Sequence, residues 1–269
     1  MKEEIQFFRI KDIPDLELYR TSNVARSVPR HIHCVFSLSV GEAGIGIHET
    51  KLEKYCITPG SIVVVNADTT HSSSVPSGST YSSRSIRIDT VLLGSLIQEI
   101  SGQRHDRLAL KQPVIYNQTL AQQILGLHNL LADSTSRLEK ESLLLDTLAK
   151  LYTHYSCEGI KPVVIGDEST PVSRVCEYLQ DCFNENVSLG QLASIAGLSA
   201  FHLAHVFTKE IGVPPHTYQL QVRLKKATDL IAYGKPLAEA ALETGFCDQS
   251  HFQKAFKKKF GISPGKYKR

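Results

Sequence analysis

The residues of this chain best suited to a specific chemical task are polar side chains near its C-terminus. Gln249, Ser250, Gln253 and Lys254 follow one another at helical spacing, so a helix would place them on one face. Gln can form two hydrogen bonds to adenine, and Lys can reach the acceptor atoms of guanine in a major groove. These residue types on one helix face therefore indicate recognition of DNA bases.

These side chains belong to a pattern that occurs twice in roughly the last eighty residues. His202, Phe207, Gly212, Pro215 and Tyr218 recur 49 positions later as His251, Phe256, Gly261, Pro264 and Tyr267. Each copy has the pattern of a helix, a glycine turn, a second helix and a Gly-x-x-Pro stop. This order is typical of a helix-turn-helix, whose second helix lies in a DNA major groove.

The second helix of each copy should have a buried face and a face that contacts DNA. The apolar residues expected to point inward are Leu203, Val206 and Phe207 in the first helix, and Phe252, Ala255 and Phe256 in the second. The residues expected to contact bases are Phe201, Ala204 and His205 in the first helix, and Gln249, Ser250, Gln253 and Lys254 in the second. Phosphate or surface positions are expected for Thr208, Lys209 and Lys257 to Lys259. For each of these residues alone, plain solvent exposure is the alternative.

The net charge of +3 is divided unevenly along the chain. Residues 1–171 carry a net charge of −2, whereas residues 172–269 carry +5. A basic C-terminal part beside a nearly neutral N-terminal part predicts that only the C-terminal part meets a polyanion such as double-stranded DNA. A solvated basic face is the alternative, and the position of the lysines on a helix-turn-helix makes it less favoured.

The composition indicates a cytoplasmic protein without a membrane segment. The apolar fraction of 42% is ordinary for a soluble protein, and no apolar run is long enough to span a bilayer. The N-terminus is too charged for a signal peptide. Six cysteines without a Cys-x-x-Cys pair favour reduced thiols over a disulfide scaffold.

The pattern of apolar residues predicts an α+β protein with two domains. Residues 1–158 should form a small β-barrel or sandwich, with strands over 35–40, 45–48, 61–65 and 82–88, followed by a pair of helices. Turns are expected at 41–44 and 59–60. The paired helices, 119–132 and 137–155, carry apolar stripes that fit either a core or a homodimer interface.

Residues 159–171 contain Gly and Pro without periodicity and are predicted to form a linker to the all-α domain, 172–269. Its helices are expected over 172–184, 189–195, 200–210, 215–232, 237–244 and 249–260, with a short turn after Pro264. Ser188, Ser199 and Asp248 stand at the N-cap positions of three of them.

The C-terminal repeat resembles the DNA-binding domain of the AraC/XylS family of bacterial transcription regulators. The resemblance covers about Val187 to Tyr267 and rests on residues at fixed spacing: Leu192-Ala193, Gly197-Leu198-Ser199, Leu203, Phe207, Gly212, Pro215, Tyr218, Arg223, Ala227, Gly245-Phe246, Phe252, Phe256-Lys257, Gly261, Ser263-Pro264 and Tyr267. It implies that the groove-reading positions are those given above. Arg is frequent in the family where His205 stands, so the first unit is expected to contact bases less strongly and with a mild dependence on pH.

Residues 30–72 resemble the cupin-type effector-binding domain that many members of this family carry. The match rests on Arg30-His31-Ile32-His33 and on Pro59-Gly60-Ser61-Ile62-Val63-Val64-Val65-Asn66 followed by His71. This resemblance implies a barrel that binds a small molecule, with polar contacts expected from His31, His33, Tyr55, His71 and Arg84. The likeness to a subgroup thought to control amino-acid exporters makes an amino acid the first expected effector.

The three histidines leave a metal site open as an alternative to an organic-ligand pocket. Metal-binding cupins hold a divalent ion with His-x-His, a downstream Glu and a later His, whereas Ser37 and Leu38 stand where that Glu is expected. Three imidazoles could still hold zinc with an open coordination position. Because the Glu is missing, we expect the histidines to line or orient the pocket, and we assign no metal, cofactor or catalytic residue.

These observations predict a sequence-specific transcription regulator whose barrel senses a small molecule. Its expected partners are double-stranded DNA, the effector, RNA polymerase and, through 119–155, a second copy of the chain. Two alternatives remain open. One is a metal-dependent cupin enzyme fused to a DNA-binding tail, and the other is an effector-independent regulator whose barrel serves dimerisation or polymerase contact.

Overall fold

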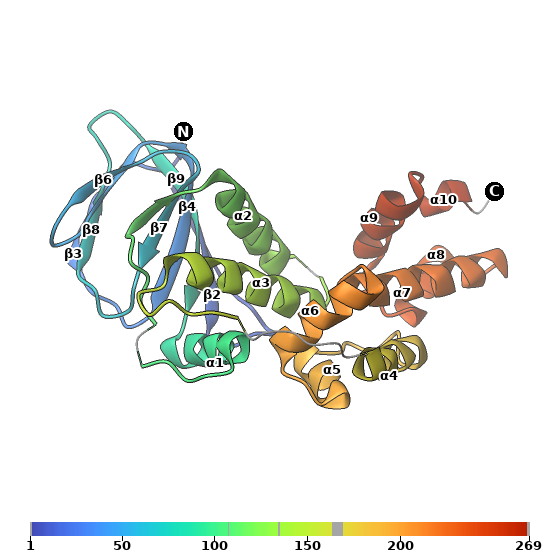
Figure 1. Cartoon of the computed structure of the whole chain (residues 1–269). Coiled ribbons are helices and arrows are strands. Elements are labelled where there is room, and N and C mark those ends of the chain that lie inside the picture. Colours follow the sequence, from blue (N-terminus) through green and yellow to red (C-terminus); the bar gives the residue numbers. More distant parts are fainter. Residues whose placement is uncertain (1, 107, 134, 163–168, 268–269) are drawn as a thin grey trace. The chain divides into compact units, whose positions relative to one another are not determined.

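The structure is a computed structural model that describes residues 2–106, 108–133, 135–162 and 169–267 (Figure 1). The chain divides into two compact units. One comprises residues 1–132 and 146–162, and the other comprises 133–145 and 163–269. The predicted first domain, 1–158, therefore ends close to this division, but residues 133–145 group with the second unit. The predicted boundaries of the domains stay predictions.

The first unit contains two antiparallel sheets, which face each other in Figure 1. Its strands are β1 (Glu4–Arg9), β2 (Leu16–Val24), β3 (Val28–His31), β4 (Phe36–Gly44), β5 (Gly46–Glu49), β6 (Lys54–Ile57), β7 (Ser61–Val65), β8 (His71–Ser74), β9 (Tyr81–Ile88) and β10 (Val114–Tyr116). The six-stranded sheet has the order β1-β2-β9-β4-β7-β10, and the four-stranded sheet has the order β3-β8-β5-β6. The predicted α+β fold with an N-terminal barrel-like sandwich is confirmed.

Strand alternation gives the larger sheet one face toward a cavity and one face toward helices. On β9, Ser83, Ser85 and Arg87 line the cavity, whereas Ile86 and Ile88 are buried on the opposite face. That opposite face is covered by α2 (Gln118–Ala132), which contacts β4, β7 and β9. A single strand therefore supplies both the polar lining of the cavity and part of the core.

The segment 41–44, predicted as a turn, belongs instead to β4. Gly41, Ala43 and Gly44 pair with β9, with a register shift between Gly41 and Ala43. Gly44 has φ = 76°, and a Cβ there would lie 1.8 Å from the carbonyl oxygen of Thr80. The glycine thus allows the backbone to approach closely at a bulge. Glycine is common at bulges as well as in turns. The turn predicted at 59–60 is present, with φ = 85° at Gly60.

Three helices complete the first part of the chain: α1 (Thr90–Ser101), α2 and α3 (Arg137–Tyr155). The bounds of α2 and α3 agree with the prediction to within one residue, whereas α1 was not predicted. Asp89 is the N-cap of α1 and accepts a hydrogen bond from the Val91 amide at 2.8 Å. This apolar helix begins two residues after the end of β9, so its first turn is hard to separate in sequence from the predicted strand 82–88.

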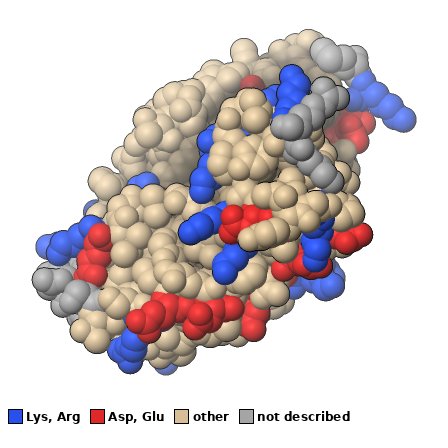
Figure 2. Space-filling model, turned by 90° about the vertical axis from the view of Figure 1, so that its right-hand side faces the viewer, with Lys and Arg blue, Asp and Glu red and all other residues tan. Residues whose placement is uncertain are grey.

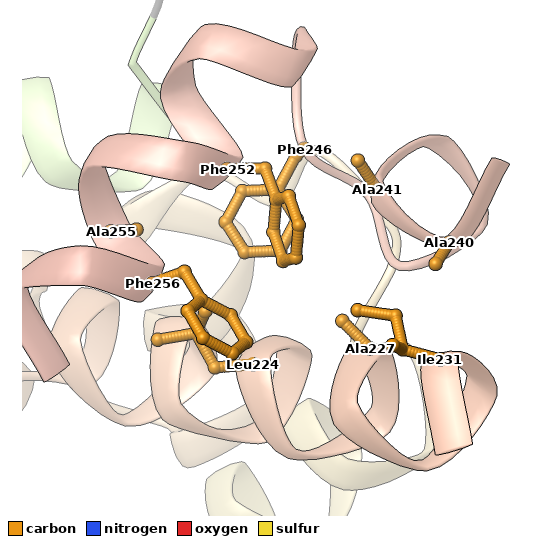
Figure 3. Close-up of a cluster of buried hydrophobic side chains, with 9 residues drawn as sticks. All are labelled: Leu224, Ala227, Ile231, Ala240, Ala241, Phe246, Phe252, Ala255 and Phe256. Atoms are coloured by element: carbon orange, nitrogen blue, oxygen red, sulfur yellow. The ribbon is translucent and has the colours of Figure 1, made fainter. Parts of the chain in front are cut away.

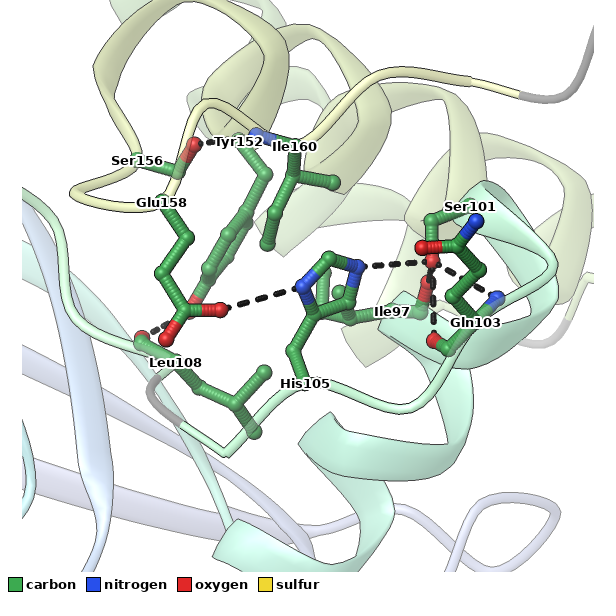
Figure 4. Close-up of polar contacts among 9 residues, drawn as sticks. All are labelled: Ile97, Ser101, Gln103, His105, Leu108, Tyr152, Ser156, Glu158 and Ile160. Carbon is green, nitrogen blue, oxygen red and sulfur yellow. Dashed lines mark hydrogen bonds and ion pairs between the residues drawn. The ribbon is translucent and has the colours of Figure 1, made fainter.

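A chain of hydrogen bonds fixes the loop that follows α1 (Figure 4). The Nε2 atom of His105 lies 3.0 Å from Ser101 Oγ, and its Nδ1 atom lies 3.1 Å from Glu158 Oε2. A Ser-His-acid order also occurs in hydrolases, where the hydroxyl must be available to attack a substrate. Here the Ser101 hydroxyl bonds the carbonyl oxygens of Ile97 and Gln103 at 2.9 and 3.0 Å. We therefore assign this set a structural role.

The second unit is helical in its C-terminal part. Its helices are α4 (Ser169–Asp181), α5 (Leu189–Ala196), α6 (Ala200–Ile211), α7 (Pro215–Ala232), α8 (Leu237–Glu243), α9 (Gln249–Phe260) and α10 (Pro264–Tyr267). α4 begins inside the segment predicted as a linker, 159–171, and residues 163–168 of that segment lie outside the described residues. The other helices match their predicted ranges to within one residue.

The core beneath the second helix-turn-helix is a cluster shared by α7, α8 and α9 (Figure 3). The buried side chains are Leu224, Ala227, Ile231, Ala240, Ala241, Phe246, Phe252, Ala255 and Phe256. The Phe252 ring meets the rings of Phe246 and Phe256 at centroid distances of 5.1 and 5.5 Å in edge-on arrangements, which aromatic pairs favour. Small alanines let α8 approach closely, so this cluster fixes the angle at which α9 is held.

Candidate nucleic-acid interface and effector cavity

The first candidate reading helix, α6, is positioned by its cap and its apolar face. The Ser199 side chain accepts a hydrogen bond from the His202 amide, and Gly212 ends the helix with a left-handed backbone. Leu203, Val206 and Phe207 are fully buried, as predicted. These contacts set the rotation of α6 about its axis and therefore decide which side chains face outward.

The expectation that Phe201 points outward is wrong. Phe201 is only 1% exposed, and its ring lies 4.0 Å from the ring of His205, one helical turn later. Residues four apart on a helix are neighbours, and an apolar ring that packs on such a neighbour withdraws from water. His205 and Ala204 are half-buried, whereas Lys209 is exposed. The base contacts expected from Ala204 and His205 stay predictions.

The second candidate reading helix, α9, exposes the polar side chains that the sequence places on its outer face. Asp248 caps the helix and accepts a hydrogen bond from the His251 amide at 2.7 Å. Its buried face is formed by Phe252, Ala255 and Phe256, as predicted. The exposed residues include all five predicted to contact DNA, namely Gln249, Ser250, Gln253, Lys254 and Lys257. Their exposure is confirmed, and their contacts with DNA stay predictions.

The helix that joins the two helix-turn-helix motifs is α7. Two of its buried polar side chains bond to the loop after α4. Arg223 donates to the carbonyl oxygens of Phe183 and Glu185 at 2.6 and 2.7 Å. Gln219 donates to the same two oxygens at 3.3 and 3.1 Å. Burial lowers the pKa of Arg223 to about 10, so the guanidinium keeps its charge at neutral pH. These bonds hold the joining helix firmly, as an arrangement of two reading helices requires.

The face drawn in Figure 2 carries Lys and Arg side chains in its centre and upper part. Asp and Glu side chains form a row at the lower left of the same face and also occur near its centre and on its right side. On α9, three consecutive lysines, Lys257, Lys258 and Lys259, lie in the last turn. Such a cluster favours attraction of phosphate groups without specifying sequence.

A cavity of about 200 Å³ lies between the two sheets of the first unit. Its lining comes from both sheets: Thr21, Val24, Arg26, Val28, His33, Ser37, Ser39, Gly46, Ile47, His48, Ile57, Val63, Val65, His71, Ser73, Ser74, Val75, Tyr81, Ser83, Ser85 and Arg87. Pockets for drug-sized ligands hold roughly 300–1,000 Å³, so this cavity suits a smaller molecule. Hydroxyl groups and cationic or imidazole side chains provide its polar contacts.

Arg87 is a cavity residue that the sequence analysis missed. Its guanidinium lies 4.0 Å from the centre of the Tyr19 ring, and its Nε atom is buried without a hydrogen-bond partner. A buried donor without a partner costs free energy until a ligand satisfies it. Strict alternation along β9 from the apolar Ile86 would have placed Arg87 on the cavity side.

Two residues expected to contact the effector do not line this cavity. Arg84 lies on the other face of β9 and pairs with Glu42, with Nε to Oε1 at 2.7 Å, and with Asn129 on α2. The Tyr55 hydroxyl donates to Glu53 at 2.6 Å. In its place Tyr81 lines the cavity, and burial raises the pKa of its phenol to about 12, so it stays a neutral hydrogen-bonding group.

The three predicted histidines are brought together beside this cavity. His31 on β3 and His71 on β8 are paired in the sheet, and their ring centres lie 4.3 Å apart. His33 lies 5.0 Å from His71 by the same measure, and His48 lies 5.5 Å from it. Burial lowers the pKa of His33, and it lowers that of His71 to about 4, so both rings are neutral at neutral pH. His33, His48 and His71 line the cavity itself.

Comparison with known proteins matches both units to known families. The AraC-like ligand binding domain family matches residues 13–148, and a helix-turn-helix domain family matches residues 192–269. The chain belongs to the AraC family of transcriptional regulators. It is therefore a DNA-binding regulator with an N-terminal ligand-binding domain.

The relatives of this chain are bacterial regulators. It is 31% identical over 251 residues to an uncharacterized HTH-type transcriptional regulator, YbfI of Bacillus subtilis, which covers 93% of this chain and 90% of the relative. It is 26% identical to the HTH-type transcriptional activator RhaS of Escherichia fergusonii, over 88% of this chain and 86% of the relative. Among solved structures, the C-terminal domain of AraT, a response regulator from Geobacillus stearothermophilus, is 29% identical, covers 39% of this chain and 88% of that chain, and gives a TM-score of 0.37.

In the part of the chain that the structure describes, no single helix has the length and apolar character needed to cross a membrane. α5 and α6 taken together meet that criterion by length and composition only, across a bend of 78°.

Proposed function

We propose that this AraC-family regulator responds to a small zwitterionic or anionic molecule, with an amino acid as the first candidate, bound in the cavity between the two sheets. The observation that carries this proposal is the Arg87 guanidinium, whose buried Nε atom has no partner. A carboxylate is the group that best matches a guanidinium, because two parallel hydrogen bonds can form. The hydroxyl groups of Ser37, Ser39 and Ser85 line the same space and would accept from a ligand ammonium group.

The effector would act by shifting an equilibrium between arrangements of the DNA-binding unit. A ligand does so only to the extent that it binds one arrangement more tightly than the other. On this proposal Gln249, Ser250, Gln253 and Lys254 contact bases, while Lys209 and Lys257 contact phosphates. We include RNA polymerase as a partner and a homodimer formed through 119–155. The apolar stripes of α2 and α3 are buried within the chain itself, so the outer faces of these helices would form the dimer contact.

Thermal unfolding of the full chain with a panel of small molecules tests this proposal. We expect one amino acid to raise the melting temperature in a saturable way, because ligand bound at about 100 times its Kd stabilises the folded state by about 2.7 kcal/mol. The corresponding amine, which lacks the carboxylate, should give no shift. Arg87→Gln should abolish the shift, and Arg84→Gln is the matched control that should retain it.

The class of effector is overturned if a neutral sugar stabilises the chain while no amino acid or other carboxylate does so. An equal response of the Arg87→Gln variant would exclude Arg87 as the ligand's partner. Absence of a response to the whole panel would favour a regulator whose barrel serves dimerisation.

A further inference from the structure

The histidine cluster beside the cavity has a geometry that goes beyond lining a pocket. His31, His33 and His71 each offer a ring nitrogen, and these three atoms lie within 4.8 Å of one another. Strand pairing places His31 on β3 opposite His71 on β8, and His33 follows two residues after the end of β3. His71 is buried, and the other two rings are half-buried, so the cluster is enclosed on the protein side.

The hydrogen bonds of the three rings leave the same nitrogen available on each. Nδ1 of His31 lies 2.9 Å from the Pro29 carbonyl oxygen, Nδ1 of His33 lies 3.0 Å from that of Val35, and Nδ1 of His71 lies 3.3 Å from that of Thr69. A carbonyl oxygen only accepts, so in each neutral ring Nδ1 carries the proton and Nε2 carries the lone pair. The Nε2 atoms of all three rings therefore have free lone pairs, and none of these atoms carries a proton.

The geometry points to a binding site for a divalent transition metal, zinc first, formed by the Nε2 atoms of His31, His33 and His71. Metal-binding histidines typically donate their other ring N–H to a backbone carbonyl or a carboxylate, which fixes the tautomer and the ring orientation. All three rings already have this second interaction. Zinc binds imidazole nitrogen at about 2.0–2.1 Å, which draws three nitrogens to about 3.4 Å from one another, so only a small closure of the rings is needed.

The donor set also decides which metals fit. Imidazole nitrogen suits zinc, copper, nickel and iron, whereas magnesium and calcium prefer oxygen ligands. Three protein ligands leave one tetrahedral position open. His33 and His71 line the cavity that Arg87 also lines, so a metal held by the cluster would lie at the edge of that space. The site would then add a Lewis-acidic contact for a ligand donor atom, whatever the identity of the effector.

Metal binding by the full chain tests this inference. After treatment with a chelator, the protein is titrated with Zn²⁺ in competition with a chromophoric chelator, and with Co²⁺ followed by visible absorption. We expect one tight equivalent of Zn²⁺ and the intense d–d absorption of tetrahedral Co²⁺, with no competition from Mg²⁺. His31→Gln, His33→Gln and His71→Gln should each weaken binding by at least about tenfold, because loss of a residue that only orients a metal ligand already costs about 10–100-fold in typical sites.

The controls separate this cluster from adventitious binding. His154→Gln removes an exposed imidazole on α3 whose Nδ1 also bonds a carbonyl oxygen, that of Lys150 at 2.8 Å, and it should leave binding unchanged. Cys34→Ser removes the exposed thiol next to His33 and should also leave it unchanged. A variant is scored only if its metal-free melting temperature matches that of the wild type. Absence of binding by the wild type, or equal binding by all three cluster variants, would overturn the inference.

Discussion

At the scale of single residues, the face of a strand decides which charged side chain can meet a ligand. Arg84 and Arg87 are three positions apart on β9, so they point to opposite sides of the sheet. Arg84 is paired with Glu42, whereas Arg87 has a buried nitrogen without a partner in the cavity. The spacing of the histidines predicted His33 and His71 of the cavity but not His48, and Arg84 was predicted in place of Arg87, which lies on the opposite face of the strand.

Another residue with a single buried polar contact is His128 on α2. Its Nε2 atom lies 3.1 Å from the Tyr19 carbonyl oxygen, and its Nδ1 atom is buried without a partner. Burial lowers its pKa below the usual 6.5, although the bond to Tyr19 acts in the opposite direction. The neutral ring is therefore the form that stabilises the fold.

The stability of the protein should therefore decrease as the pH is lowered, and His128 should account for part of this decrease. Since its folded pKa is depressed, its contribution is complete above about pH 6.5 and is lost as the pH falls toward the folded pKa. His128→Gln keeps an amide donor but cannot be protonated. We expect the loss of melting temperature between about pH 7.5 and pH 5.5 to be smaller in this variant than in the wild type, and unchanged in the exposed control His154→Gln. An identical pH dependence in all three proteins would refute this role.

At the scale of elements, the helices were predictable and several strands were not. Ser188, Ser199 and Asp248 are the N-caps of α5, α6 and α9, and each helix begins directly after its cap. Short strands such as β6 and β8 have four residues each and acquire their conformation from pairing with distant segments. Local sequence carries little information on such pairing.

The same limit explains the error at Phe201. The helix phase correctly placed Leu203, Val206 and Phe207 inside, but it also assigned Phe201 to water. Burial of Phe201 depends on the other helices that pack on α6, and both α4 and α5 contact it. Periodicity alone cannot identify such neighbours.

The cap of α9 has a consequence that can be measured. Asp248→Ala removes the acceptor for the His251 amide and should lower the free energy of unfolding of the C-terminal unit by about 1 kcal/mol. Affinity for DNA should fall as well, since the predicted base-contacting residues stand in the first turns of this helix. Chemical denaturation and DNA titration measure the two effects. Asp248→Asn, an equally good cap, should restore most of both, and a failure of Asn to do so would contradict the capping explanation.

At the scale of the whole molecule, charge and chemistry are divided between the two parts of the chain. Residues 1–171 carry a net charge of −2 and contain the cavity and the histidine cluster, while residues 172–269 carry +5 and contain both candidate reading helices. This division was visible in the sequence because charge and internal repeats need no knowledge of tertiary contacts. The set of residues that line the cavity could be found only from the structure, because they come from strands far apart in the sequence.

Selection of binding sites from random double-stranded DNA by the full chain tests the central claim most directly. Two base-specified segments are predicted, with centres about 10–10.5 base pairs apart, since two reading helices on one face of DNA occupy successive major-groove segments. The double variant Gln249→Ala/Gln253→Ala should lose preference in one segment only, by about 1–3 kcal/mol for each base contact removed. Gln221→Ala, an exposed glutamine on α7, is the matched control and should select the same sites as the wild type. Recovery of no preferred sequence, or an unchanged preference in the double variant, would contradict the assignment of α9 as a base-reading helix.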